Sequence, residues 1–291
     1  MAAPTPLQRH LLRGVQNVAL DNRLHRALRG DAAEGVVDER EWIGQRSLAQ
    51  LEQVALGVGV PKAWVDYARA AGERGERWQP GTTMLGSGHV DRDQLLAGLA
   101  HEVRALQDIA GIGAVFLDRG GLDEDADSRF RRVAGMTWQR VGAISHALRL
   151  STEERHQAWR RGQQHWATAV ATRLSSAEPK ELAQQWNRIV AADFSALAIP
   201  VMVLQGAGIT AEDTTAAMPT TADDMSAQVA EALTGLDQAG GPARAGTVAA
   251  IENAVRAAGP ATDAGLDAHA AGTDPPPPAP HSPEPSSGVD P

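Results

Sequence analysis

LEQVALGVGVPKAWVDYARA, residues 51–70, contains two stretches of helical apolar periodicity separated by a turn that includes Gly59. Apolar residues that recur at helical spacing on both sides of the turn predict two short helices. Glycine adopts the left-handed conformation of a tight turn at little cost, and proline is well suited to the first position of a helix. Gly59 and Pro61 therefore predict a corner at which one helix ends and the next begins. A second capping box, at Ser47, is expected to start the first of these helices, Gly72 to end the second, and Asp91 to cap the long helix that follows.

The same twenty residues resemble the helix-turn-helix motif of bacterial DNA-binding proteins. That motif has a small residue where its two helices touch, a glycine at its ninth position, and apolar residues that fix the angle between the helices. Ala55 and Gly59 occupy the first two of these places. The apolar places are occupied by Val54, Val60, Val65 and Ala68.

The resemblance implies that the second helix enters the major groove of DNA, with its early residues facing base edges. The candidate DNA-binding residues are Lys62, Ala63, Asp66, Tyr67, Arg69, Arg74 and Arg77. A plain corner between two helices needs the same glycine and the same small contact residues. At the level of the sequence, both interpretations stay open.

Two further segments carry arginines that suit contact with phosphates. Residues 1–30 have a net charge of +4 and form a predicted helix opened by a capping box at Thr5. In the loop 73–78, Arg77 precedes Trp78, and an arginine beside an aromatic ring can hold a nucleic-acid backbone and stack on a base. The alternatives are a solvated helix face and a solvated loop, since glutamates are interleaved with the arginines of the loop.

Composition limits the classes of protein to which the chain can belong. The 291 residues include no cysteine, which excludes disulfides, thiolate metal sites and cysteine nucleophiles. No apolar run approaches the roughly 18–20 residues that a membrane-spanning helix needs. We therefore expect a cytoplasmic protein without a membrane partner.

Charge and aromatic residues are unevenly distributed along the chain. Residues 201–291 carry 12 acidic residues against two arginines, so the net charge of −9 belongs to this part. All aromatic residues lie between Trp42 and Phe194. Because aromatic side chains bury the largest areas, the packed core is expected there.

These patterns predict an all-α fold: a multi-helix bundle with a helix-turn-helix-like corner. The helical domain is expected over residues 5–204, with the corner at 47–72, and successive amphipathic patterns with short turns predict antiparallel helices over 91–197. An acidic linker with weak helices is expected at 205–259. Residues 260–291 are rich in proline and too poor in apolar surface to offset their ordering entropy, which predicts a disordered tail.

One short run differs from the helical pattern. Residues 199–204, IPVMVL, form the strand-like stretch of the sequence and could equally be buried extended chain that closes the bundle. In the predicted helix over residues 155–173, Trp159 and Trp166 are spaced as core residues, with arginines on the outer face. The alternative is that these arginines face phosphates, since residues 131–200 have a net charge of +5.

Enzymatic motifs are incomplete in this sequence. His101-Glu102 begins the HExxH pattern of zinc sites, but Ala105 occupies the place of the second histidine. A Gly-x-Ser-x-Gly nucleophile elbow and a Gly-Lys-Ser/Thr phosphate loop are both missing from the sequence. We therefore expect no catalytic residue, no metal and no cofactor.

The sequence thus favours a non-enzymatic, DNA-associated helical protein, either a regulator or an accessory factor of a DNA-processing assembly. Double-stranded DNA is the first candidate partner, and a protein partner or self-association through the bundle is the second. The alternative is a protein-interaction scaffold without DNA contact, in which the corner at Gly59 is structural.

Overall fold

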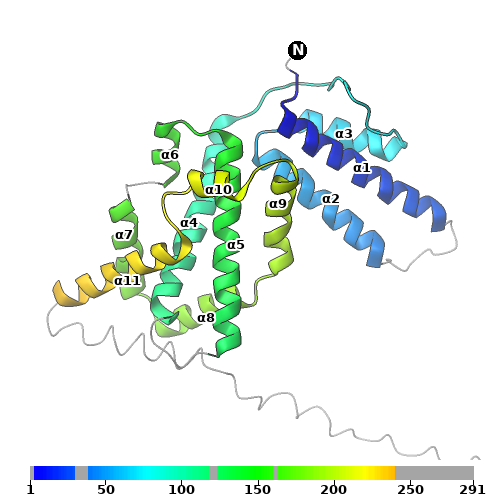
Figure 1. Cartoon of the computed structure of the whole chain (residues 1–291). Coiled ribbons are helices and arrows are strands. Elements are labelled where there is room, and N and C mark those ends of the chain that lie inside the picture. The colour runs from blue at the N-terminus through cyan, green and yellow to red at the C-terminus, as the bar shows by residue number, and fades with distance from the viewer. Residues whose placement is uncertain (1–2, 30–38, 118–122, 160–162, 240–291) are drawn as a thin grey trace, which may run out of the picture. The chain divides into compact units, whose positions relative to one another are not determined.

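The chain is all-α throughout the residues that the computed structural model describes, namely 3–29, 39–117, 123–159 and 163–239 (Figure 1). These residues belong to one compact unit that spans Met1–Gly259. The predicted all-α class is confirmed. The predicted disordered tail at 260–291 lies outside the described residues.

The first three helices are α1 (Pro6–Arg29), α2 (Glu39–Gly57) and α3 (Lys62–Arg74). The predicted capping box opens α1, because the Thr5 hydroxyl accepts from the Gln8 amide at 3.2 Å and the Gln8 side chain accepts from the Thr5 amide at 3.0 Å. The last of the three ends at Gly75, which has a left-handed φ of 92°.

Two long helices, α4 (Arg92–Phe116) and α5 (Glu124–Leu148), follow and pack against each other (Figure 1). The Asp91 carboxylate accepts from the Gln94 amide at 3.0 Å and thereby caps α4. The remaining helices are α6 (Thr152–Trp159), α7 (Gln163–Ser175), α8 (Pro179–Val190), α9 (Phe194–Gly206), α10 (Ala211–Ala217) and α11 (Ala222–Ala239).

A bundle core forms where α4, α5, α7, α8 and α11 meet. Its centre is an aromatic stack in which the Trp186 ring lies 5.0 Å from that of Phe116 and 4.7 Å from that of Phe130, measured between centroids. Offset aromatic stacking at such distances adds about 0.5–1.5 kcal/mol to the burial of the rings. The predicted concentration of the core among the aromatic residues agrees with this stack.

A second core, the corner core, lies between α1, α2 and α3 and is closed by residues of α5 and α9. Leu11, Val15 and Leu12 contribute from α1, and Ala143 and Leu204 contribute from α5 and α9. The corner therefore packs against the bundle through residues of α5 and α9.

Several predicted helix boundaries differ from the structure. The second capping box, at Ser47, does not start a helix, because α2 already begins at Glu39 with two glutamates in its first turn. The third helix does not stop at Gly72, which lies inside it and is buried. The expected single helix over 155–173 is two helices, α6 and α7, with Trp159 and Trp166 buried as predicted.

The strand-like run at 199–204 is helical and lies within α9. Asp193 caps this helix by accepting from the Ser195 amide at 3.0 Å, and Pro200 lies inside it. Pro200, Val201 and Leu204 are buried. The continuous apolar character therefore reflects burial of a helix, which apolar periodicity alone cannot separate from a buried strand.

Residues 205–239 are part of the packed unit rather than a linker. The Thr210 hydroxyl accepts from the Asp213 amide at 3.1 Å and starts α10. In α11, Met225 and Val229 are fully buried in the bundle core. The remaining residues of the predicted acidic region, 240–259, lie outside the described residues.

A search of the described helices for membrane spans finds no single helix that is both long and apolar enough. Only α8 and α9 taken together, with a bend of 54° between them, meet the criteria of length and composition.

Candidate nucleic-acid interface

The corner between α2 and α3 is a glycine-capped helix end. Gly59 has a φ of 83°, and its amide donates to the Leu56 carbonyl at 3.1 Å. The Val60 amide donates to the Ala55 carbonyl at 2.9 Å, which completes a Schellman arrangement. Ala55 and Val60 are both buried. The predicted glycine turn and the predicted small contact residue are therefore both present.

The first helix holds this corner in place. The Gln8 side-chain amide donates to the Gly59 carbonyl at 3.0 Å. At the other end, a side chain at Gly72 would place its Cβ only 2.3 Å from the Gln16 carbonyl oxygen of α1. The absence of a side chain at Gly72 therefore allows α1 and α3 to approach closely, and α1 fixes the orientation of α3.

The exposed face of α3 carries both signs of charge. The Lys62 ammonium lies 2.7 Å from a carboxylate oxygen of Asp66. The Arg69 guanidinium lies 3.7 Å from Glu52 and 3.8 Å from Glu73. These side chains are accessible to solvent, apart from that of Glu52, which is only partly so. The predicted DNA-binding cations of the helix are therefore exposed but neutralised by neighbouring acids.

The end of α3 repeats this pairing. The Arg74 guanidinium donates to the Glu76 carboxylate at 2.6 Å. This hydrogen bond lowers the pKa of Glu76 below its ordinary value and raises that of Arg74. In contrast, the pKa of Glu52 is raised, mainly because burial disfavours its charged form.

The loop that follows α3 covers part of its N-terminal turn. A side chain at Gly86 would place its Cβ 2.7 Å from the Ala63 Cβ. Tyr67 is partly buried against the corner core. Of the predicted base-facing residues, Lys62 and Asp66 therefore have accessible side chains, whereas Ala63 lies beneath the loop and Tyr67 contributes to packing.

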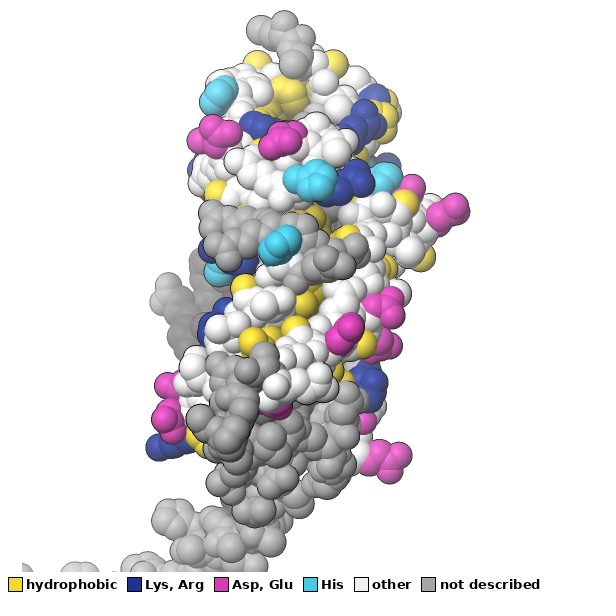
Figure 2. All heavy atoms as spheres, turned by 90° about the vertical axis from the view of Figure 1, so that its left-hand side faces the viewer, with side chains coloured by type: hydrophobic (Ala, Val, Ile, Leu, Met, Phe, Trp, Pro, Cys, Tyr) yellow, Lys and Arg dark blue, Asp and Glu magenta, His cyan; other side chains and the backbone are white. Residues whose placement is uncertain are grey.

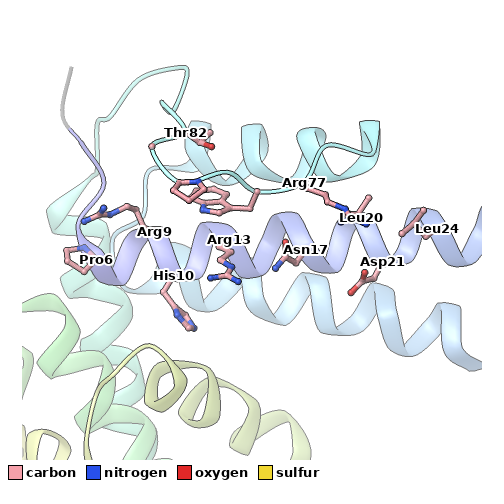
Figure 3. A pocket seen from close by; sticks show the side chains of 13 residues that line it. Pro6, Arg9, His10, Arg13, Asn17, Leu20, Asp21, Leu24, Arg77 and Thr82 are labelled. Carbon is pink, nitrogen blue, oxygen red and sulfur yellow. The ribbon is translucent and has the colours of Figure 1, made fainter.

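A separate groove runs between α1 and residues 77–82 of the loop, with a volume of about 730 Å³ (Figure 3). We call it the α1 groove. Its lining includes Arg9, Arg13, Asn17, Asp21, Arg77 and Trp78.

Hydrogen bonds from α1 position the loop above the groove. The Gln16 side chain donates to the Glu76 carbonyl at 2.9 Å, and the Arg23 guanidinium donates to the Arg74 carbonyl at 2.7 Å. Trp78, partly buried, packs against the corner core. The two basic segments that lie apart in the sequence, the first helix and the loop 73–78, therefore form one site.

The arginines of the α1 groove differ from those of α3 in their partners. Arg9, Arg13 and Arg77 form no ion pair with any residue that the structure describes. Arg9 and Arg13 are one helical turn apart on α1, and Arg77 reaches toward the same helix from the loop (Figure 3). Asp21 is the acidic residue of the lining, so the groove has a net positive charge.

Sequence reasoning identified Arg77 but not Arg9 and Arg13 individually. The available signal was their separation by four residues in a basic helix, which places both on one face. What the sequence could not show was that these residues line the same groove as Arg77 and Trp78, more than sixty residues later in the chain.

Figure 2 shows a face on which acidic and basic side chains are interspersed, with apolar side chains visible between them. A surface of mixed sign attracts a polyanion less than the α1 groove does, because the lining of the groove has a net positive charge.

The incomplete zinc motif has a structural role. Glu102 is ion-paired with Arg140 of α5. Among the described residues, no group of three or more histidine, cysteine, aspartate or glutamate side chains is arranged to hold a metal ion. Comparison of the chain with protein-family models, with curated proteins and with solved structures finds no match.

Proposed function

We propose that this protein associates with double-stranded DNA without catalysing a reaction, as a regulator or an accessory factor of a DNA-processing assembly. The observation that carries the proposal is the α1 groove, whose lining combines Trp78 with three arginines that have no acidic partner among the described residues. Arginine suits this role because its planar guanidinium forms paired hydrogen bonds with phosphate. The groove supplies contacts to the backbone, which give affinity without sequence selection.

In this proposal α3 has a secondary role. An exposed ion pair contributes only about 0–1 kcal/mol, so Lys62 can exchange Asp66 for a phosphate at little cost. However, Asp66, Glu73 and Glu76 then remain close to the polyanion and repel it. The paired cations of α3 therefore contribute less to affinity than the arginines of the α1 groove.

The test is a mobility-shift titration of the full chain with random-sequence duplex DNA at several salt concentrations. Affinity falls with salt, and each phosphate contact makes the slope of log affinity against log salt steeper by about 0.9. The triple variant Arg9→Gln, Arg13→Gln, Arg77→Gln should therefore make the slope shallower by up to about 2.7. It should also weaken binding at every salt concentration.

The matched control is Lys62→Gln, Arg69→Gln, Arg74→Gln, which removes the same charge from cations that have acidic neighbours. We expect a smaller change in slope for this variant. A larger loss in the control would make α3 the docking element, and equal losses would show that only overall charge matters. A wild-type chain without salt-dependent binding would exclude DNA association.

The protein-interaction scaffold is the second candidate, and exposed apolar side chains favour it. Trp42 and Ile43 of α2 are about half exposed, at 51% and 48%, and Met202 of the neighbouring α9 is 58% exposed. Arg46 connects the two helices, because it lies over the Trp42 ring and pairs with Asp193 at the start of α9. Apolar side chains on adjacent elements are typical of contact surfaces between proteins.

Sedimentation velocity over a range of protein concentrations tests self-association through this surface. A concentration-dependent increase in sedimentation coefficient that Ile43→Glu and Met202→Glu abolish would support the scaffold. Leu28→Glu, at an exposed leucine near the end of α1, serves as the control for added charge. A wild-type chain that stays monomeric would exclude self-association through α2 and α9.

A further inference from the structure

A second large cavity lies between the α2–α3 corner and the long helices. Its volume is about 710 Å³, within the range of roughly 300–1,000 Å³ that is typical of small-molecule sites. The corner contributes one wall, and α4, α5 and α9 contribute the others. We call it the corner cavity. Its apolar lining includes Val54, Leu56, Val60, Leu95, Ile144 and Pro200.

The cavity has one ion pair in its wall. Arg140 of α5 pairs with Glu102 of α4, and the two side chains are only 21% and 26% exposed. A guanidinium has five N–H donors and a carboxylate has two acceptor oxygens. Within the described residues, Glu102 Oε1 is the acceptor assigned to Arg140, and Oε2 of the same carboxylate accepts no hydrogen bond. The pair therefore retains donors and an acceptor for a further polar group.

The charges that line the cavity sum to zero. Lys62 and Arg140 are balanced by Asp91 and Glu102. Transfer of a charged ligand into a largely apolar site costs free energy unless an opposite charge compensates it. Each of these charges already has a partner: Arg140 and Glu102 pair with each other, Lys62 pairs with Asp66, and the Asp91 carboxylate accepts from the Gln94 amide. The lining therefore favours an uncharged ligand.

From the volume, the apolar walls and the half-buried ion pair, we infer that the corner cavity is a binding site for a neutral, largely apolar small molecule with a hydrogen-bonding group at one end. The apolar body packs against Val54, Val60 and Leu95, and the polar group meets Arg140 and Glu102. This site is separate from the α1 groove, because no residue of the groove lines it, and Lys62 is the only proposed DNA contact among its described lining residues.

Two glycines provide a way to fill the cavity without disturbing the core. Gly98 of α4 and Gly57 at the end of α2 line the cavity, and a Cβ at either position would meet no atom within 4 Å. Gly135 of α5 is equally unobstructed but lies outside the lining. Large side chains at the first two positions occupy the ligand's space, whereas one at Gly135 does not.

The experiment is a fluorescence titration of the full chain with N-phenyl-1-naphthylamine, a neutral apolar dye with one N–H donor. We expect a saturable, blue-shifted increase in emission for the wild type and for Gly135→Trp. Gly98→Trp should weaken dye binding at least tenfold, and Gly57→Trp provides a second test if the first variant does not fold. Circular dichroism establishes which variants are folded.

The sulfonated dye 1-anilinonaphthalene-8-sulfonate tests the inferred neutrality of the ligand, and we expect it to bind the wild type more weakly. Stronger binding of the sulfonated dye would overturn the assignment of a neutral ligand. Equal binding of the neutral dye to all folded variants would show that the dye binds outside the corner cavity and would overturn the inference. Absence of dye binding to the wild type would also overturn it. If the protein does not bind DNA in the mobility-shift titration, the inference of a small-molecule site in the corner cavity still stands.

Discussion

At the scale of single residues, two glycines determine how the first three helices fit together. Gly59 takes the positive φ that ends α2, and Gly72 removes the side chain that would separate α1 from α3. Their roles differ physically, because the first concerns backbone conformation and the second concerns space. The orientation of α3, and with it the position of Arg77 beside α1, depends on both.

The change Gly72→Ala tests the close approach of α1 and α3. The new Cβ would lie 2.3 Å from the Gln16 carbonyl oxygen and 2.7 Å from the Ala19 Cβ, so the helices must separate. We expect the free energy of unfolding to fall by about 1–3 kcal/mol, as is typical of overpacking. Urea denaturation measures this change.

The control is Gly135→Ala in α5, where the new Cβ meets no atom within 4 Å. Alanine has a higher helix propensity than glycine, so this variant should be more stable by up to about 1 kcal/mol. Destabilisation of similar size in both variants would contradict the role that we assign to Gly72.

The ion pair between Arg92 and Glu154 gives stability a defined dependence on pH. The Arg92 guanidinium donates to the two Glu154 oxygens at 2.8 and 3.0 Å, and these hydrogen bonds with those from Ser151 lower the pKa of Glu154 from 4.5 to about 2. A depressed carboxylate pKa contributes stability that is fully present above pH 4.5 and is lost as the pH falls toward 2.

The variant Glu154→Gln should therefore be less stable than the wild type at neutral pH, by an amount that shrinks between pH 4.5 and 2. Urea midpoints measured across this range test the expectation. Glu153→Gln, which removes the adjacent carboxylate outside this ion pair, is the matched control. A difference between Glu154→Gln and the wild type that stays constant with pH would refute the linkage.

At the scale of elements, α11 shows how a segment of acidic composition becomes part of a core. Its first turn carries Asp223 and Asp224, which complement the positive end of the helix dipole. Met225, Val229 and Leu233 follow at intervals of four residues and are buried on one face. The acidic residues lie on the opposite face or at the end, so charge does not prevent the helix from packing.

The change Met225→Ala tests the contribution of α11 to the fold. Truncation of a fully buried methionine typically lowers the free energy of unfolding by about 2–5 kcal/mol, and Met225 is 0% exposed. Glu231→Ala, at an exposed position of the same helix, should change stability by no more than about 0.5 kcal/mol. Thermal or urea denaturation that shows equal effects for the two variants would mean that α11 does not pack as described.

At the scale of the whole molecule, net charge is a poor guide to the candidate interface. The chain carries −9 overall, yet the arginines of the α1 groove have no acidic partner among the described residues. Charges beyond about 8–10 Å are largely screened at physiological ionic strength. The local balance of charge in the groove therefore contributes most to its attraction for phosphate.

The sequence allowed prediction of those elements whose signals lie within one or two helical turns. The capping box at Thr5, the turn at Gly59 and the cap at Asp91 are local, and all three are present. The second capping box, at Ser47, failed because the residues before it continue the helix. The run at 199–204 was ambiguous because a fully buried helix and a fully buried strand share the same apolar pattern.

The candidate site was less predictable than the helices. Among the residues predicted to bind DNA, Lys62, Arg69 and Arg74 are paired with acids, and this pairing depends on side chains from two helices and a loop. Arg77 belongs to the α1 groove, which forms only when the loop is fixed over α1. Its role as a DNA-binding residue, like those of the others, stays a prediction that the mobility-shift experiment tests.

The sequence by itself determined the all-α class, the glycine-capped corner and the start of the first helix, because periodicity and capping are set by residues a few positions apart. Only the tertiary structure decided that α11 completes the bundle core, that the cations of α3 are neutralised, and that Arg9, Arg13 and Arg77 line one groove. Those outcomes depend on contacts between distant segments, whose relative positions follow from packing of the whole chain.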